Sequence, residues 1–370
     1  MHVLGSNELV EDVFNRDLCI GCGACVNLCP YYKNHRGKTA RLFPCDLSQG
    51  HCHAYCPKAE VNLDELSRRI WDVPYDGSPL GNCGTILAAR AGAKMRPSAF
   101  QAGGTVSALI TLALKNGMID AAALTDRQGL NPVPCLVTDW QEVTKYARSK
   151  FMAAPTLAAV NAAILEGYIR LGVVATPCQL TAVAQMRSNP MARENFADPV
   201  ALTIGLFCNW SLDTRQLSAL LAEKLDIAAI RGMDIPPPPA GIMALETDNG
   251  RVEIPLSEIK PIIPETCFIC PDMTAEFSDV SVGMFEGHPG WNTLVIRSKP
   301  GARLVTSACD EGYLETKDLP PESIAQLTRA AAEKKARALR MLIRRKLINN
   351  EKGERAALRM PPDIIEKILS

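Results

Sequence analysis

The sequence predicts a central body of the α/β (α+β) class, with a small cysteine-rich module before it and a helical segment after it. Helical and strand patterns alternate along residues 96–320, which is typical of an α/β fold. Seven of the fourteen cysteines fall before residue 60. The last part, residues 321–370, opens with a long helical pattern rich in Ala, Lys and Arg.

Domain boundaries follow from these shifts in composition. With 370 residues the chain is long enough for two or three domains. Between the cysteine-rich module and the body, residues typical of loops interrupt the pattern, namely Pro74, Gly77, Pro79 and Gly81. We therefore expect a module at 1–62, a connector at 63–95, a body at 96–320 and a C-terminal helical segment at 321–370.

The spacing of apolar residues predicts the elements of the body and of the C-terminal segment. A helix is expected from Thr105, and Gly117 ends it. Along residues 321–349 an apolar stripe indicates a docking or capping helix, although its basic residues could also suggest nucleic-acid binding. The other expected elements are strands at 119–124, 171–175 and 200–207, helices at 155–169 and 212–226, a turn at 176–178, and a hairpin turning at 248–250.

Composition excludes several classes of function. The chain has 40 Lys and Arg residues and 40 Asp and Glu residues, so a general attraction to nucleic acid is not indicated. No apolar run approaches the ~20 residues of a membrane-spanning helix, and no signal peptide is evident. The cysteines are therefore expected to be reduced, metal-binding thiols in the cytoplasm rather than disulfides of a secreted protein.

Residues 19–30 read Cys-Ile-Gly-Cys-Gly-Ala-Cys-Val-Asn-Leu-Cys-Pro. This spacing is the signature of a bacterial ferredoxin, whose thiolates hold an iron–sulfur cluster. A complementary Cys-Pro pair follows at Cys56-Pro57, and in such proteins the remote cysteine completes the first site. The first 4Fe–4S site is thus expected to consist of Cys19, Cys22, Cys25 and Cys56.

A second N-terminal site has only three clear ligands: Cys29, Cys45 and Cys52. An ordinary motif would offer one more cysteine between the last two. A second cluster could take a non-cysteine ligand from Asp46, Gln49 or His51, recruit Cys83, hold three irons, or be absent.

The body contributes another possible set. Cys178 and Cys208 follow two predicted strands, and Cys267 and Cys270 form a Cys-x-x-Cys pair. Because strand ends meet at one edge of a parallel sheet, these four thiols could surround a further cluster; the alternative is that they are small buried hydrophobic residues. Cys135 and Cys309 have no partner spacing and are expected in the core.

A flavin commonly converts between one-electron clusters and two-electron donors. The chain lacks the Gly-x-Gly-x-x-Gly fingerprint of a standard Rossmann site. Gly103-Gly104-Thr105 opens a helix, which suits either a phosphate or a simple N-terminal turn. Thr176 and Gln179 follow a strand, where ligands of open sheets usually bind. The loop with Trp291 and Asn292 could border a flavin ring or be only a turn.

Together these residues resemble the coenzyme F-420 hydrogenase/dehydrogenase beta-subunit family over roughly residues 85–340. The N-terminal module is similar to that of the family's F-420H2 dehydrogenase input subunits. The matching segments are 103–109, 175–179, 205–208 and 267–293, the last with its Cys-Phe-Ile-Cys-Pro-Asp and Gly-Trp-Asn-Thr motifs.

The resemblance implies an oxidoreductase subunit that binds FAD and passes a hydride between F-420 and the flavin, which exchanges electrons with two or three 4Fe–4S clusters. It implies redox partner subunits in a multi-subunit complex, with peripheral attachment to a membrane complex as one option. Cys178, Cys208, Cys267 and Cys270 become cluster ligands. The implied FAD neighbours are Gly103, Gly104, Thr105, Lys150, Thr176, Gln179, Trp291 and Asn292.

The sequence departs from the family pattern in two places. Arg148-Ser149-Lys150-Phe151 stands where the family has Gly-Thr-Lys-Tyr, and Pro236–Pro239 replaces a Lys-Gly-Lys-Phe-Trp stretch. The identity of the soluble hydride carrier is therefore open. One alternative is an electron relay without a soluble substrate, in a complex of the hydrogenase, formate dehydrogenase or heterodisulfide-reductase type; another is a zinc-bearing interaction protein.

Overall fold

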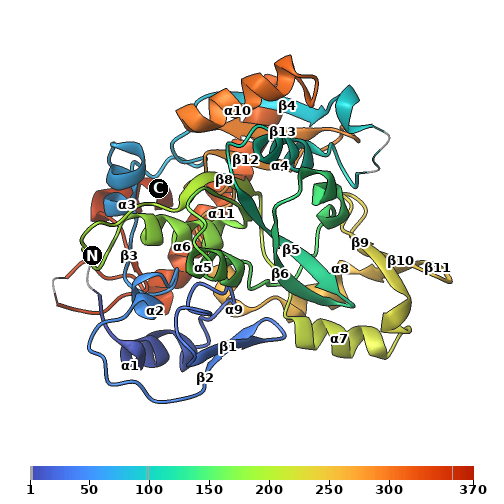
Figure 1. Ribbon diagram of the computed structural model, residues 1–370. Helices are drawn as coiled ribbons and strands as arrows, with labels where there is room; N and C mark the ends of the chain where they lie inside the picture. The colour runs from blue at the N-terminus through green and yellow to red at the C-terminus, as the bar shows by residue number, and fades with distance from the viewer. Residues whose placement is uncertain (1–2, 97, 99, 352) are drawn as a thin grey trace.

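The computed structural model describes residues 3–96, 98, 100–351 and 353–370. Its centre is an eight-stranded sheet of order β14-β4-β13-β12-β8-β7-β5-β6 (Figure 1). The four strands β12, β8, β7 and β5 are parallel, and the flanking strands pair antiparallel. The strands are β4 (Ile86–Ala91), β5 (Ala121–Gln128), β6 (Asn131–Val137), β7 (Leu171–Ala175), β8 (Val200–Leu206), β12 (Val280–Met284), β13 (Asn292–Ile296) and β14 (Leu314–Asp318).

Helices cover both faces of this sheet, as the predicted α/β class requires. Successive residues of β5 alternate between two cores: Ala122 packs with α4 and α10, and Ala123 packs with α5 and α6. This alternation follows from the two-residue period of a strand. The covering helices are α4 (Thr105–Lys115) and α10 (Lys299–Asp310) on one face and α5 (Leu157–Leu165) and α6 (Pro177–Arg187) on the other.

A smaller antiparallel sheet, β11-β10-β9, extends from the body (Figure 1). Thr247 pairs with Gly250, which confirms the predicted hairpin. A separate apolar core lies beneath it, with Leu217, Met243 and Ile259 fully buried. Its elements are α7 (Thr214–Ala222), β9 (Ile230–Asp234), β10 (Ile242–Thr247), β11 (Gly250–Pro255) and α8 (Leu256–Ile259).

The N-terminal module shares its core with the C-terminal segment. Leu9 and Leu18 pack in one cluster with Leu339 and Leu342, and β3 pairs in parallel with β15. The elements are α1 (Ser6–Leu9), β1 (Tyr32–His35), β2 (Lys38–Arg41), α2 (His51–Ala54), β3 (Val61–Asn62), α3 (Leu63–Trp71), α9 (Glu265–Phe268), α11 (Pro321–Arg344), β15 (Leu358–Arg359) and α12 (Pro362–Leu369). Short irregular helices are η1 (Val10–Phe14), η2 (Ala93–Met95), η3 (Trp140–Tyr146), η4 (Ile227–Ala229) and η5 (Lys260–Ile262).

Three expectations need correction. The stretch 63–95, expected as a connector, holds α3 and β4, and β4 lies inside the main sheet. β4 reads Ile-Leu-Ala-Ala-Arg-Ala, and alanine is depleted in strands, which hid it. The turn expected at 176–178 is instead the start of α6. Thr176 is the N-cap and forms a capping box with Gln179, and Pro177 occupies the first helical position. The helix expected to reach residue 349 ends at Arg344.

Within the described ranges, none of the helices is both long and apolar enough to span a bilayer.

Candidate iron–sulfur centres

The loop of the N-terminal motif is held tightly against the body. Gly21 and Gly23 have positive φ angles of 69° and 86°, a conformation that glycine adopts without strain. A Cβ on Gly23 would lie 2.6 Å from the Pro155 carbonyl oxygen. The Cys22 carbonyl accepts a 3.1 Å bond from the Leu157 amide, and the Asn161 amide nitrogen donates to the carbonyls of Gly23, Ala24 and Val26. The start of α5 thus fixes the loop.

The structure brings the expected four thiols of the first site together. They are the N-terminal set, defined as Cys19, Cys22, Cys25 and Cys56, and all four line one cavity. Burial raises the pKa of Cys56 to about 12, and the nearby Cys19 adds to the rise. Burial likewise raises the pKa of Cys22 and Cys25 well above the ordinary value. Bound iron would supply the positive charge that such crowded thiols need to ionise.

Three further thiols gather beside that set. Burial raises the pKa of Cys52, and Cys29 and Cys45 lie close enough to raise it further. Cys29 is exposed to solvent. Cys83 lies near the buried Arg297 instead, so the structure gives no support to its recruitment. Burial lowers the pKa of His51, whose ring packs 5.0 Å from the ring of Tyr55; Asp46 and Gln49 are exposed.

The body set, defined as Cys178, Cys208, Cys267 and Cys270, also comes together. Cys178 lies in the first turn of α6, Cys208 follows β8, and the Cys-x-x-Cys pair spans the end of α9. Burial raises the pKa of Cys178 to about 11, and the nearby Cys270 thiol raises it further. Burial also raises the pKa of Cys208, with Cys267, Cys178 and Cys270 adding to the rise. The predicted convergence of the strand ends therefore occurs.

Three cysteines lie apart from these sets: Cys83, described above, Cys135 and Cys309. Cys135 and Cys309 pack at the edge of the core between the sheet and α4, as expected. In the part of the chain that the structure describes, no three His, Cys, Asp or Glu side chains converge tightly enough for a single metal ion.

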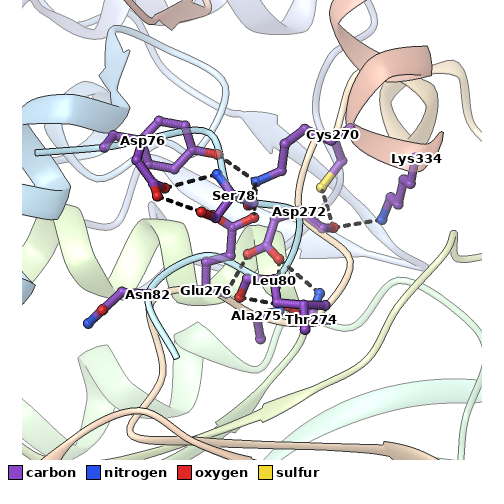
Figure 2. A network of polar contacts seen from close by, with 12 residues as sticks. Asp76, Ser78, Leu80, Asn82, Cys270, Asp272, Thr274, Ala275, Glu276 and Lys334 are labelled. Atoms are coloured by element: carbon purple, nitrogen blue, oxygen red, sulfur yellow. Dashed lines mark hydrogen bonds and ion pairs between the residues drawn. The ribbon is translucent and has the colours of Figure 1, made fainter. Parts of the chain in front are cut away.

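Buried charged side chains lie next to the body set, and Figure 2 shows them near Cys270. Asp272, two residues after Cys270, accepts bonds from the amides of Thr274, Ala275 and Glu276. From α11, the Lys334 ammonium donates to the carbonyls of Cys208 and Asp272, at 2.6 and 2.7 Å. Burial opposes its charge, yet Cys270 and Cys208 raise the pKa of Lys334. A cation thus lies close enough to Cys208 and Cys270 to interact with both thiols.

The neighbouring Lys335 forms a buried ion pair. Its ammonium lies 2.7 Å from Glu276 Oε1 and also donates to the Tyr75 hydroxyl and the Ser78 carbonyl. Burial raises the pKa of Glu276 to about 7, although Lys335 opposes the rise. Sequence reasoning missed both lysines because a basic helix normally exposes such residues. The signal was their position on the apolar side of the helix, next to Ala338 and Leu339.

Four of the eight expected flavin neighbours lie together at the start of α4. The Asn292 side chain accepts from the Thr105 amide at 3.4 Å and donates to the Gly283 carbonyl. Added Cβ atoms on Gly103 and Gly104 would meet Asn292 and Phe100. Both glycines therefore permit close packing with the chain's own atoms.

The remaining four, Lys150, Trp291, Thr176 and Gln179, have other contacts. Lys150 donates to the carbonyls of Tyr146, Ala147 and Arg148, and Ser149 next to it bonds to Gln101. The Trp291 ring lies beneath the Arg90 guanidinium, 4.5 Å away. Thr176 and Gln179 cap α6 beside Cys178, and Gln179 donates to Ala154 and Thr156. The structure thus brings only part of the expected set into direct contact.

Two crowded sets of thiols on an α/β scaffold define the class: an iron–sulfur protein of electron transfer. Comparisons with known proteins identify the family within this class. Residues 86–161 and 168–322 match the N-terminal and C-terminal models of the coenzyme F-420 hydrogenase/dehydrogenase beta subunit, and residues 12–32 match a 4Fe-4S binding domain. The chain belongs to this family of oxidoreductase subunits.

Individual relatives support the same family assignment. The chain is 30% identical to a subunit of the F-420H2 dehydrogenase of Methanosarcina mazei, over 82% of this chain and 85% of that protein. It is 27% identical to the beta subunit of the coenzyme F-420 hydrogenase of Methanothermobacter thermautotrophicus, over 72% and 96%. A chain of the F-420-reducing [NiFe] hydrogenase complex from Methanosarcina barkeri superposes with a TM-score of 0.66 at 25% identity, covering 72% of this chain and 94% of that one.

Proposed function

We propose that this chain is an iron–sulfur flavoprotein subunit that passes electrons between coenzyme F-420 or a similar two-electron carrier, FAD and 4Fe–4S clusters, and on to a partner subunit. The observation that carries the proposal is the proximity of the two thiol sets. Cys178 of the body set is close enough to Cys22 of the N-terminal set to contribute to the raised pKa of Cys22, after burial and Cys56. Two clusters held there would form a continuous route for single electrons.

The residues present fit 4Fe–4S clusters. Each set offers four thiols, all free, and cysteine thiolates are the usual ligands of such clusters. The N-terminal set would hold one cluster and the body set another. The three thiols Cys29, Cys45 and Cys52 would hold a further cluster, either with three irons or with a fourth ligand of another kind. Free thiols also suit a reducing cytoplasm, the location we propose.

One atom supports the fit of these residues to FAD. The Thr105 Oγ1 is buried and has no hydrogen-bond partner among the described residues, at the N-terminus of a helix of eleven residues. A phosphate oxygen would satisfy this hydroxyl, and the helix dipole favours negative charge there. Lys150, whose pKa is lowered by burial to about 8, lies on the segment joined to Gln101. FAD would supply the conversion between hydride and single-electron transfer.

The direct test is anaerobic. The protein is reconstituted with iron, sulfide and FAD, and reduced F-420 is offered with a viologen dye as acceptor. We expect dye reduction that depends on both F-420 and bound FAD. No turnover in protein that carries its full complement of FAD and iron would contradict the proposal.

The second candidate is an electron relay without a soluble substrate. Two departures favour it: Arg148–Phe151 differs from the family motif, and Pro236–Pro239 occupies the connection between β9 and β10. A stable redox partner in anaerobic pull-down, together with failure to bind F-420, would select this function. Binding of F-420 with hydride transfer to FAD would reject it.

A further inference from the structure

A buried lysine lies between the two thiol sets. Lys58 follows Cys56 by two residues and is only 6% exposed. It lines the cavity of the N-terminal set and also a second cavity that contains Cys178 and Cys270 of the body set. No other lysine lines either cavity within the described part of the chain. Among the described residues, Lys58 is therefore the lysine that lines the cavities of both sets.

Hydrogen bonds fix this position. The Lys58 ammonium donates to the Thr266 carbonyl at 3.1 Å, and the Thr266 hydroxyl donates to the Leu18 carbonyl at 2.6 Å. Thr266 precedes Cys267 of the body set, and Leu18 precedes Cys19 of the N-terminal set. The backbone that carries one ligand of each set is thus tied to Lys58 through a single buried threonine.

The ammonium is short of partners in the protein itself. It can donate three hydrogen bonds, but Thr266 supplies the one acceptor found among the described residues. By contrast, Lys335 has a carboxylate and two further acceptors. A buried cation without a counter-charge is costly. Four thiolates around iron form an anionic group, so clusters held by the two thiol sets would supply this negative charge.

The electrostatics of the thiols point the same way. Burial raises the pKa of Cys56 and of Cys178, and the Lys58 charge opposes the rise at both. Lys334 opposes the rise for Cys208 of the body set. Among the described residues, Lys58 thus acts on one thiol of each set, and Lys334 acts on Cys208 and Cys270 of the body set.

We propose that Lys58 is the shared counter-ion of the two iron–sulfur sites and raises the reduction potentials of both together. The inference rests on the proposed function, because it requires clusters in both sets. Its fixed charge stabilises each reduced state, which carries one more negative charge than the oxidised state. When one electron leaves one cluster and enters the other, the total charge around Lys58 stays the same. The Lys58 charge thus favours reduction at either site.

The test compares Lys58→Met, Lys58→Arg and Lys334→Met in the full chain. Reduction potentials are measured by anaerobic titration followed by electron paramagnetic resonance, with Cys56→Ala and Cys208→Ala used to assign the signals. For Lys58→Met we expect both potentials to fall by a similar amount, of the order of a tenfold change in the reduction equilibrium, or about 59 mV for one electron. Lys334→Met should lower only the potential of the body cluster, and Lys58→Arg should leave both near the wild-type values.

Each outcome decides a separate question. Wild-type protein that binds no iron and sulfide in either set rejects the proposed function. Wild-type protein with both clusters, but a Lys58→Met variant whose potentials stay unchanged or shift at one site only, rejects the shared counter-ion. If Lys58→Met loses iron from both sites while Lys58→Arg retains it, charge is required and the inference stands. If both variants lose iron alike, the side-chain shape is required instead and the inference falls.

Discussion

The N-terminal set and the body set are built by different means. The loop of Cys19, Cys22 and Cys25 is held by neutral bonds, mainly those from Asn161 to three backbone carbonyls. The body set comes from separate strand and helix ends and is supported by Lys334 and by the Lys335–Glu276 ion pair. A contiguous motif needs only local geometry, whereas an assembled set needs distant elements held in place. Charge at the second set should therefore make it the more sensitive to pH and to single substitutions.

The largest expected effect comes from removing one ligand of either set. Cys56→Ala and Cys208→Ala should each lose the iron of one cluster and block dye reduction, because a cluster needs all its thiolates. Iron and sulfide assays with electron paramagnetic resonance would check this. Cys309→Ala, at the core edge, serves as control and should keep its iron. Full iron content in Cys208→Ala would remove the body set from the proposal.

Next in size is the loss of the buried ion pair. Lys335→Met leaves the Glu276 carboxylate buried without its partner, and breaking such a pair typically costs about 3–5 kcal/mol. We expect a large fall in the free energy of unfolding, measured by denaturant titration of the cluster-loaded protein. Arg340→Met, on the exposed side of the same helix, should change it by less than about 0.5 kcal/mol. Equal effects from both variants would show that the pair is unimportant.

Glu276 should also make stability depend on pH. Its pKa is raised from 4.5 to about 7 in the folded protein, mainly by burial. The folded state therefore binds this proton more tightly, so the free energy of unfolding should fall as pH rises between about 4.5 and 7. Each unit of raised pKa corresponds to about 1.4 kcal/mol.

Glu276→Gln removes the titrating group and should flatten the dependence in that pH range. The comparison is made by denaturant titration at several pH values in wild-type and variant proteins. Two results would contradict the role of Glu276. One is a wild-type free energy of unfolding that rises with pH over this range; the other is a variant whose free energy of unfolding changes with pH as steeply as that of wild type.

The smallest effect on stability is expected from removing the hydrogen bonds that hold the loop of the N-terminal set. Asn161→Ala removes the donor to three carbonyls and should cost about 1–3 kcal/mol, with little dependence on pH because no charge is lost. Thermal unfolding and the rate of iron loss to a chelator would measure it. Ile164→Ala, on the exposed side of the same helix, is the matched control. A stronger pH dependence in Asn161→Ala than in wild type would break the contrast between the two sets.

The sequence predicts the parts of this molecule that depend on local pattern. The strand Leu171–Ala175 and the hairpin at 248–250 agree with the structure, because apolar runs and turn residues encode them directly. The spacing of Cys19, Cys22 and Cys25 likewise predicts their grouping. β4 escaped prediction because its alanines carry little strand preference.

Long-range features could not be predicted for a different reason. The depth at which Lys58, Lys334 and Lys335 lie depends on how the module and α11 pack on the body, and no local pattern specifies that packing. Composition alone would place all three at the surface. The partial grouping of the expected flavin neighbours has the same origin, since Lys150 and Trp291 sit on loops whose course is set by tertiary contacts.

The pairing of β3 with β15 bears on how the protein is made. Residues 358–359 are synthesised long after the cysteine motif has left the ribosome, yet they complete the small sheet next to it. Arg359 also forms the ion pair with the buried Glu60, 2.7 Å apart. During translation, β3 therefore has no strand partner until residues 358–359 have been made.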